Sequence, residues 1–300
     1  MTRRERKQLV TGLTFVSPWL VGFLAFTLLP VGLSLYYSFC DFSLIERDAA
    51  GNVQAVWVGT DNYKELARDP EIYRTLKNTG LYALMALPAG MLVSIGLALM
   101  LNAPIRGQAV YRTIIFLPSL VPVVASAMVW MWLFNARLGL FNVILSWVGI
   151  AGPAWIGDKY WAMPSLAMMS LWGVGHTVVI YLAGLQDIPR DLYEAAEIDG
   201  AGPIRRLFNV TLPMLSPVIF FNLIMAIIGT LQVFAVPFIM TGGGPERSTY
   251  MYTQYLYESA FTYLKMGYAS AMAWLQLLII LAFTALAFWT SKRWVHYQGR

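Results

Sequence analysis

The sequence predicts an all-α membrane protein with six transmembrane helices, and its composition supplies the first evidence. Of its 300 residues, 58% are hydrophobic and only 12% are charged, whereas an ordinary soluble domain carries roughly 25% charged residues. The mean hydropathy is +0.59. Such a chain would expose too much apolar surface if it folded in water. The composition therefore excludes a disordered protein, a disulfide scaffold and a typical cytosolic enzyme.

Six long apolar runs are the second observation. About 20 residues of helix cross the hydrocarbon core of a bilayer, and each run has at least 22 residues. All 21 basic and 16 acidic residues lie between or outside the runs. The predicted spans are 13–39, 79–101, 113–134, 162–184, 213–240 and 267–290.

The distribution of Lys and Arg orients these spans, because basic residues favour the cytoplasmic side. If the N-terminus is cytoplasmic, the inner segments hold 12 Lys or Arg in 61 residues and the outer segments hold 9 in 92. The inner segments are then 1–12, 102–112, 185–212 and 291–300, and the outer ones 40–78, 135–161 and 241–266. Both termini are therefore expected in the cytoplasm, as tails 1–12 and 291–300 around a membrane domain of 13–290.

The first span is read as an uncleaved anchor, because its 27 residues are too long for the apolar region of a signal peptide. Prolines predict kinks in the first, third and fifth spans, where neighbouring helices can satisfy the freed carbonyls. The outer segment 135–161 carries three tryptophans and is expected along the outer membrane interface. Cys40 is the single cysteine, and it is expected to be a small apolar filler.

The sequence lacks the motifs of membrane-embedded chemistry. Its two histidines, His176 and His296, are 120 residues apart, and there is no zinc-binding or catalytic motif. There is also no phosphate-binding glycine loop. We therefore expect no catalytic residue, no metal site and no cofactor bound by this chain. Within the spans His176 is either a packed imidazole or a polar group lining a path.

The loop 185–212 is the most informative segment. Pro189 starts a short helix whose acidic residues lie near its positive end, and Asp199-Gly200 ends it. A second short helix is predicted from Ala201 to Val210. The small Ala195 and Ala196 allow a partner surface to approach closely.

The loop resembles the signature of ABC importer permeases. That signature reads Glu-Ala-Ala, three residues, Gly, nine residues and then Val/Ile-x-Leu-Pro. The sequence matches it in register with Glu194-Ala195-Ala196, Gly200 and Val210-Thr211-Leu212-Pro213. Asp199, Ala201 and Phe208 fit the extended form found in maltose and glycerol-3-phosphate (carbohydrate uptake) permeases. Further similarities to that family are Gly59–Tyr63, Phe116–Pro122, Leu182–Pro189 and Thr241–Pro245.

The resemblance implies a type I ABC importer permease fold in a bacterial cell (inner) membrane, and a transporter subunit, not an enzyme. Its partners would be a second permease, two ATP-binding subunits that carry the ATP and Mg, and an external solute-binding protein. The transport cycle would alternate access between the two sides. The residues implied for coupling to the ATPase are Glu194, Ala195, Ala196, Asp199 and Gly200.

The resemblance also implies residues of a substrate path. They are Ser119 and Val123 in the third span, Trp172, Gly173 and His176 in the fourth, and Gly229 and Gln232 in the fifth. Hydroxyls, amides and aromatic faces suit a sugar or oligosaccharide. Two alternatives remain. One is a permease for another solute, such as a glycerol phosphodiester or a sugar acid, although no span has the Arg or Lys that would recruit an anion. The other is an integral membrane enzyme.

Overall fold

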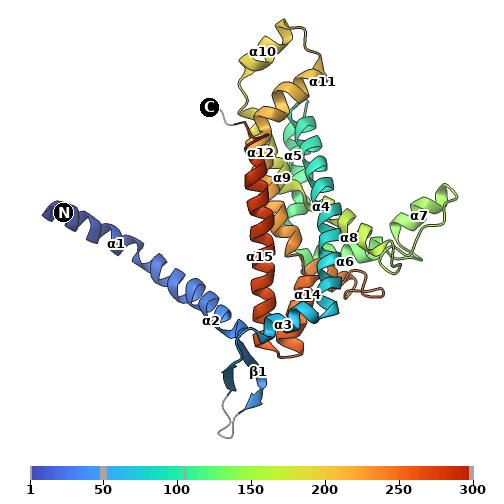
Figure 1. Cartoon of the computed structure of the whole chain (residues 1–300). Helices are drawn as coiled ribbons and strands as arrows, with labels where there is room; N and C mark the ends of the chain where they lie inside the picture. Colours follow the sequence, from blue (N-terminus) through green and yellow to red (C-terminus); the bar gives the residue numbers. More distant parts are fainter. Residues whose placement is uncertain (1, 48–52, 105, 297–300) are drawn as a thin grey trace. The chain divides into compact units, whose positions relative to one another are not determined.

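The computed structural model describes residues 2–47, 53–104 and 106–296 (Figure 1). The chain forms two compact units. Unit 1 comprises Met1–Asp69 and Leu256–Leu277, and unit 2 comprises Pro70–Tyr255 and Leu278–Arg300.

Most of both units is helical. The elements of unit 1 before residue 70 are α1 (Arg3–Phe23), the π-helical turn η1 (Leu24–Leu28), α2 (Leu29–Ser38), β1 (Cys40–Arg47), β2 (Val53–Trp57) and α3 (Asp61–Arg68). Those of unit 2 are α4 (Pro70–Asn102), α5 (Gln108–Phe116), η2 (Leu117–Leu120), α6 (Val123–Leu133), α7 (Leu140–Trp147), α8 (Ala162–Ser170), η3 (Leu171–Gly173), α9 (Gly175–Gln186), α10 (Arg190–Ile198), α11 (Pro203–Arg206), η4 (Leu207–Thr211), α12 (Leu212–Leu231) and α13 (Ala235–Met240). The remaining elements are α14 (Tyr252–Tyr257), η5 (Glu258–Thr262) and α15 (Met266–Ser291).

Four helical runs among the described residues are long and apolar enough to cross a membrane: Arg6–Ser38, Pro70–Asn102, Pro203–Met240 and Met266–Ser291. Two bent pairs would raise the count to six if each pair is one span: Gln108–Leu120 with Val123–Leu133, and Ala162–Gly173 with Gly175–Gln186. Each predicted span falls within one of these helices or pairs to within one residue. Apolar run length therefore located the helices well.

The second predicted span, 79–101, lies within a longer helix, because α4 starts at Pro70. Proline suits the first turn of a helix, where its missing N–H would have no partner in any case. The turns before residue 79 carry charged side chains, and Glu71 forms an ion pair with Arg74 at 2.8 Å. Helical hydrogen bonds do not require apolar side chains, so the helix continues beyond the run that a bilayer demands.

The prediction of a purely α-helical chain was wrong in the first outer segment, where β1 and β2 form an antiparallel hairpin. Its pairs include Cys40 opposite Trp57 and Phe42 opposite Ala55. Alternating apolar and polar residues at 40–43 fit a strand. Cys40 is buried at the start of β1. Asn62 fastens α3 to this point by donating to the carbonyls of Ser38 (3.0 Å) and Cys40 (2.9 Å).

The core of unit 2 forms where α4 packs against α8, α9 and α12. One buried cluster includes Tyr181 and Leu215, and a second includes Trp130 and Leu166. Small residues let the helices approach closely. A Cβ on Gly184 of α9, for example, would come within 2.7 Å of the Val218 side chain of α12.

The tryptophans of segment 135–161 differ in their surroundings. Trp147 is 78% exposed, as expected of a residue at a membrane interface. Trp155 instead packs on Phe134 at 5.6 Å, and its indole N–H donates to Asn142 at 2.7 Å. Trp155 is therefore held within the fold, and the placement of this segment at the membrane interface stays a prediction.

The loop after α9 forms a helical hairpin at one end of unit 2, where α10 and α11 lie together (Figure 1). The predicted first helix is present as α10. The second helix was predicted to end at Val210, and this was wrong, because α11 runs through η4 directly into α12. Pro213 has no N–H to donate to the helical hydrogen bonds. In the wider π turn just before it, the Leu212 N–H donates to the Leu207 carbonyl, so the helix continues through this segment.

Candidate functional site

Two broken helices of unit 2 meet at their bends. The axes of α5–η2 and α6 differ by 99°, and those of α8–η3 and α9 differ by 52°. Pro118 lies in η2, and Pro122 precedes the first turn of α6. Each proline removes an N–H donor, so the helix ladder cannot run through this segment. Irregular backbone at such depth is tolerated where it is buried in protein or lines a cavity.

Gly175 allows the two bends to touch. A Cβ at this position would lie 2.7 Å from the Ile115 carbonyl oxygen, 2.9 Å from Phe116 Cα and 3.0 Å from Ser119 Oγ. Two of these three neighbours are backbone atoms, which cannot rotate away. A side chain at residue 175 would therefore push α9 away from η2.

A cavity of about 200 Å³ lies beside this contact. It is bounded by both bends together with α4 and α13. Its lining residues are Tyr82, Pro118, Ser119, Val121, Val123, Ser126, Met169, Ser170, Trp172, Gly173 and Val236. None of these lining residues is charged, and four of them offer a hydroxyl group. The cavity can therefore hold an uncharged solute by hydrogen bonds and ring contacts.

Four of the seven residues predicted for a substrate path line this cavity: Ser119, Val123, Trp172 and Gly173. The other three, His176, Gly229 and Gln232, are exposed and are not among its lining residues. Gly229 and Gln232 lie at the end of α12, where the Gln232 N–H donates to the Ile228 carbonyl at 3.2 Å. The rings of His176 and Phe116 pack edge to face, with 4.9 Å between their centroids.

The lining groups suit hydroxylated ligands. Ser119 Oγ donates to the Phe116 carbonyl at 2.6 Å, and Ser170 Oγ donates to the Ala167 carbonyl at 2.6 Å. Each hydroxyl donates its hydrogen to a backbone carbonyl, and its oxygen keeps lone pairs that can accept a hydrogen bond from a ligand. The Trp172 ring is 36% exposed and meets Trp130 edge-on at 6.2 Å. An exposed indole held in this way offers a flat apolar face.

The residues of this region that sequence reasoning missed include the hydroxyl-bearing Tyr82, Ser126 and Ser170, and Gly175 at the contact between the bends. One signal was available, since Ser126 follows Val123 by three residues and so shares its helix face. Tyr82 comes from the second span, which the resemblance did not implicate. Gly175 depends on a contact between two distant segments, which no local pattern records.

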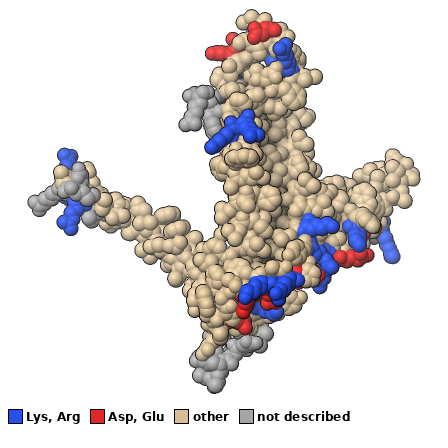
Figure 2. All heavy atoms as spheres, viewed as in Figure 1, with Lys and Arg blue, Asp and Glu red and all other residues tan. Residues whose placement is uncertain are grey.

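The residues predicted for coupling lie on and just after α10. The helix has no buried residue, and Glu194 and Ala195 are exposed while Ala196 is half-buried. Asp199 caps the C-terminus, and Gly200 follows with φ of 72°, a conformation that glycine adopts without strain. Space-filling representation shows acidic and basic side chains gathered at this end of unit 2 (Figure 2).

Two contacts fasten α10 to the helix that continues into α12. The Tyr193 hydroxyl lies 3.0 Å from Thr211 Oγ1, and Arg206 forms an ion pair with Glu197 at 3.2 Å. A displacement of α10 would therefore be passed to η4 and α12 through side chains as well as through the connecting chain.

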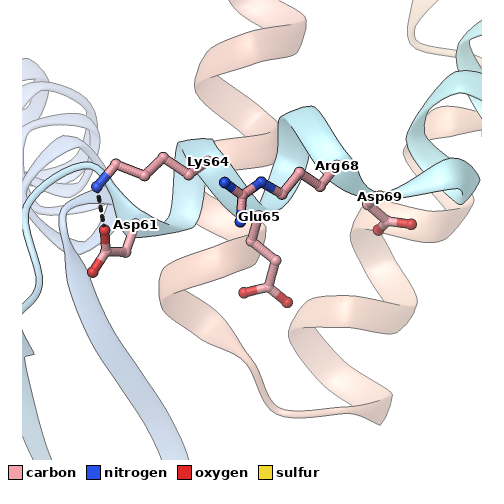
Figure 3. Close-up of a pocket in the computed structure, with 5 residues that line it drawn as sticks. All are labelled: Asp61, Lys64, Glu65, Arg68 and Asp69. Carbon is pink, nitrogen blue, oxygen red and sulfur yellow. Dashed lines mark hydrogen bonds and ion pairs between the residues drawn. The ribbon is translucent and has the colours of Figure 1, made fainter.

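The predicted outer segments are also charged. On unit 1, a shallow pocket is lined by Asp61, Lys64, Glu65, Arg68 and Asp69, with Lys64 bonded to Asp61 at 2.7 Å (Figure 3). On unit 2, Lys159 pairs with Glu246 at 2.6 Å. The hydrogen bond and negative charge of Glu246 raise the pKa of Lys159 above its ordinary value.

Comparisons with known proteins agree with this arrangement. Residues 86–296 match the family described as "Binding-protein-dependent transport system inner membrane component". The chain is 39% identical to "Probable ABC transporter permease protein YesP" of Bacillus subtilis (strain 168), over 100% of this chain and 96% of that protein. It is 35% identical to "Sulfoquinovosyl glycerol transport system permease protein SmoG" of Agrobacterium fabrum, over 86% of this chain and 82% of that protein.

A solved structure shares the fold. It is the crystal structure of a bacterial ABC transporter involved in the import of the acidic polysaccharide alginate. One chain of it superposes with a TM-score of 0.81 at 24% sequence identity, over 96% of each chain.

Proposed function

The chain belongs to the family of binding-protein-dependent transport inner membrane components, and we propose that its own substrate is an uncharged sugar or short oligosaccharide. It is a permease subunit of an ABC transporter of the sugar and oligosaccharide importer type, and not an enzyme. The name of its relative SmoG refers to sulfoquinovosyl glycerol, a sulfonated and therefore anionic sugar conjugate, so the proposal of an uncharged substrate rests on the cavity of this chain and not on that relative.

The observation that carries the proposal is the chemistry of the cavity. Its lining offers hydroxyl groups and the Trp172 ring but no charge. A sugar places its C–H face on an aromatic ring and hydrogen-bonds through its rim. A glycerol phosphodiester or sugar acid would favour an Arg or Lys in the lining. We therefore favour a neutral substrate over these two alternatives for the part of the path that this chain supplies.

The cavity is small for an oligosaccharide, and we propose that a second permease subunit completes the path. The exposure of His176, Gly229 and Gln232 supports this proposal, because residues open in this chain could face the partner. Substrate sites of transporters commonly lie near the bilayer midplane at discontinuous helices. The two bends around Gly175 are breaks of this kind.

We further propose that each bent pair is one span, giving six spans with both termini in the cytoplasm of a bacterial cell. The excess of Lys and Arg in the inner segments supports this orientation. In it, α10 faces the cytoplasm, and the charged outer segments face a solute-binding protein. A cavity whose lining carries no charged residue fits a solute that crosses uncharged.

Coupling to ATP hydrolysis is assigned to α10 in this proposal. Glu194 contacts an ATP-binding subunit, Ala195 and Ala196 permit a close fit, and Asp199 and Gly200 end the helix so that the chain can turn back. ATP and Mg are bound by that subunit and not by this chain. Closure of two ATP-binding subunits draws α10 inward, and the contacts to Thr211 and Arg206 pass this motion to α12.

The test is the ATPase activity of the purified complex in a bilayer disc, together with its binding protein and a panel of oligosaccharides. Stimulation by one uncharged sugar is the expected result, and it would identify the substrate. If only phosphorylated or acidic solutes stimulate hydrolysis, the chain remains an ABC permease but the proposed substrate class is wrong.

A further inference from the structure

A second cavity of unit 2 lies away from the two bends. Its volume is about 700 Å³, within the roughly 300–1,000 Å³ typical of ligand sites. The walls come from α4, η4, α12 and the residues after α15. The lining residues are Leu92, Ile95, Gly96, Leu99, Leu207, Phe208, Leu212, Pro213, Ser216, Ile219, Arg293, Trp294 and His296. We refer to this set as the terminal groove.

Three helices of membrane-spanning length end around the terminal groove. α4 ends at Asn102, α15 ends at Ser291, and Pro203–Met240 begins a few residues before Leu207. The groove therefore lies where apolar spans meet water. In the proposed orientation this is the cytoplasmic leaflet, and the inference that follows rests on that orientation.

The chemistry of the groove is apolar inside and cationic at its edge. Its one hydroxyl is already engaged, because Ser216 Oγ donates to the Pro213 carbonyl at 2.6 Å and accepts from the His296 N–H at 2.8 Å. Arg293 is the only lining residue with a permanent charge. Its guanidinium lies over the Trp289 ring at 5.6 Å.

Two basic residues that follow α15, Lys292 and Arg293, have no ion-pair partner among the described residues. Basic side chains are visible where α15 ends (Figure 2). The nearby Arg206 is held by Glu197. An apolar slot beside basic side chains that lack an ion-pair partner, at a membrane boundary, suits a ligand with an apolar tail and an anionic head.

We propose that the terminal groove binds an anionic phospholipid, with one acyl chain along α4 and α12 and its phosphate against Arg293. Basic pockets between membrane helices on the cytoplasmic side are suited to anionic headgroups. Trp294 suits the same boundary, because indoles favour the interface. The bound lipid would contact Leu207 and Phe208 of η4, the turn that joins the coupling hairpin to α12, and so would stiffen that joint.

The experiment uses the complete complex in discs containing either phosphatidylglycerol or phosphatidylcholine, each with a photoreactive group in one acyl chain. After irradiation, labelled peptides are mapped by mass spectrometry. We expect phosphatidylglycerol to label the groove faces of α4 and α12 more strongly than phosphatidylcholine does. Arg293→Ala should reduce phosphatidylglycerol labelling about five-fold, which corresponds to about 1 kcal/mol for one basic residue at the membrane surface. Ile219→Trp, which fills the slot, should reduce labelling by both lipids.

Arg205→Ala is the matched control, because it removes the same charge near the same end without touching the groove lining. Labelling in this variant should stay within two-fold of the native complex. An equal fall in Arg205→Ala and Arg293→Ala, or equal labelling by the two lipids, would overturn the proposal. Labelling of the chain alone that disappears in the assembled complex would identify the groove as a protein interface instead.

This test does not depend on transport. Labelling that persists while no sugar stimulates ATP hydrolysis would leave the lipid site standing and refute the proposed substrate. Protease access to a tag fused after residue 300, in sealed vesicles, tests the orientation separately.

Discussion

The two ends of unit 2 differ sharply from the bends between them. At the ends the side chains are charged and exposed, as at Glu194 on α10 and at the Lys159–Glu246 pair. At the bends no cavity-lining residue is charged, and the position of each helix depends on close backbone contact at Gly175. In the proposed assembly, charge marks the surfaces offered to other proteins, whereas backbone geometry shapes the path.

This difference sets how each region should respond to substitution. An exposed residue on α10 can change its charge without disturbing packing, so its variants should report on partners. A residue at the bends cannot change its volume without moving a helix, so its variants should report on both shape and stability. The predictions below test this division, in order of decreasing effect.

Glu194→Arg should have the largest effect on transport. The substitution reverses a charge at the proposed ATPase contact, and opposed like charges at an interface cost several kcal/mol. We expect uptake to fall by about 100-fold or more, while the thermal stability of the permease stays within a few degrees because no packing is lost. Uptake and stability would be measured in the same membranes. Glu194→Gln keeps the shape of the side chain, and its uptake should lie between those of the native protein and Glu194→Arg. Unchanged uptake in Glu194→Arg would disprove the coupling role.

Gly175→Ala should come next, and here stability should change as well. The new methyl group would approach the Ile115 carbonyl oxygen to 2.7 Å, and overpacking of this kind costs about 1–3 kcal/mol. We expect a lower melting temperature and about ten-fold lower uptake. Gly90→Ala in α4 is the matched control, because a Cβ there meets nothing within 4 Å and residue 90 does not line the cavity. Equal effects in the two variants would show that the close contact at residue 175 is unimportant.

How much could be predicted from the sequence follows the same division. Apolar runs located the helices because a bilayer requires about 20 apolar residues for each crossing. The helix at 190–198 was predicted because Pro189 and Gly200 mark its ends locally. The hairpin at 40–57 was missed because a two-stranded sheet beside long apolar helices gives a weak local signal.

The candidate site was less accessible to sequence reasoning. Ser119, Val123, Trp172 and Gly173 were placed on one path through resemblance, and they line one cavity. Tyr82 and Gly175 were missed, because their roles arise from contacts between segments far apart in the chain. Continuity of the second loop helix with α12 was missed for a different reason, since it depends on the π turn of η4, which the sequence did not predict.

Trp172→Ala should have a moderate effect that is confined to transport. The ring is 36% exposed, so its removal leaves little empty volume in the core. Loss of one stacking face is worth about 0.5–1.5 kcal/mol, which predicts an about two- to twelve-fold weaker response of ATP hydrolysis to the loaded binding protein. Trp147→Ala, at a site with 78% exposure outside the cavity, is the control. If basal and stimulated hydrolysis fall together in Trp172→Ala, the ring is structural and does not contact substrate.

The smallest effect is expected at the other charged end, in Glu246→Gln. The carboxylate of Glu246 raises the pKa of Lys159, so removing it should lower that pKa toward its ordinary value of 10.5. A raised lysine pKa stabilises the folded state at every pH below the unfolded value and ceases to do so as pH rises through the folded value. Between pH 6 and 9 the native and variant stability curves should therefore be parallel, and they should converge only in strongly alkaline buffer. Thermal melts across pH, with the Lys159 resonance followed by NMR, would check both statements. Exposed ion pairs contribute little to stability, so uptake should not change unless the pair also contacts the binding protein. A large loss of uptake with an unaltered melting temperature would make this end a docking surface of the same kind as α10.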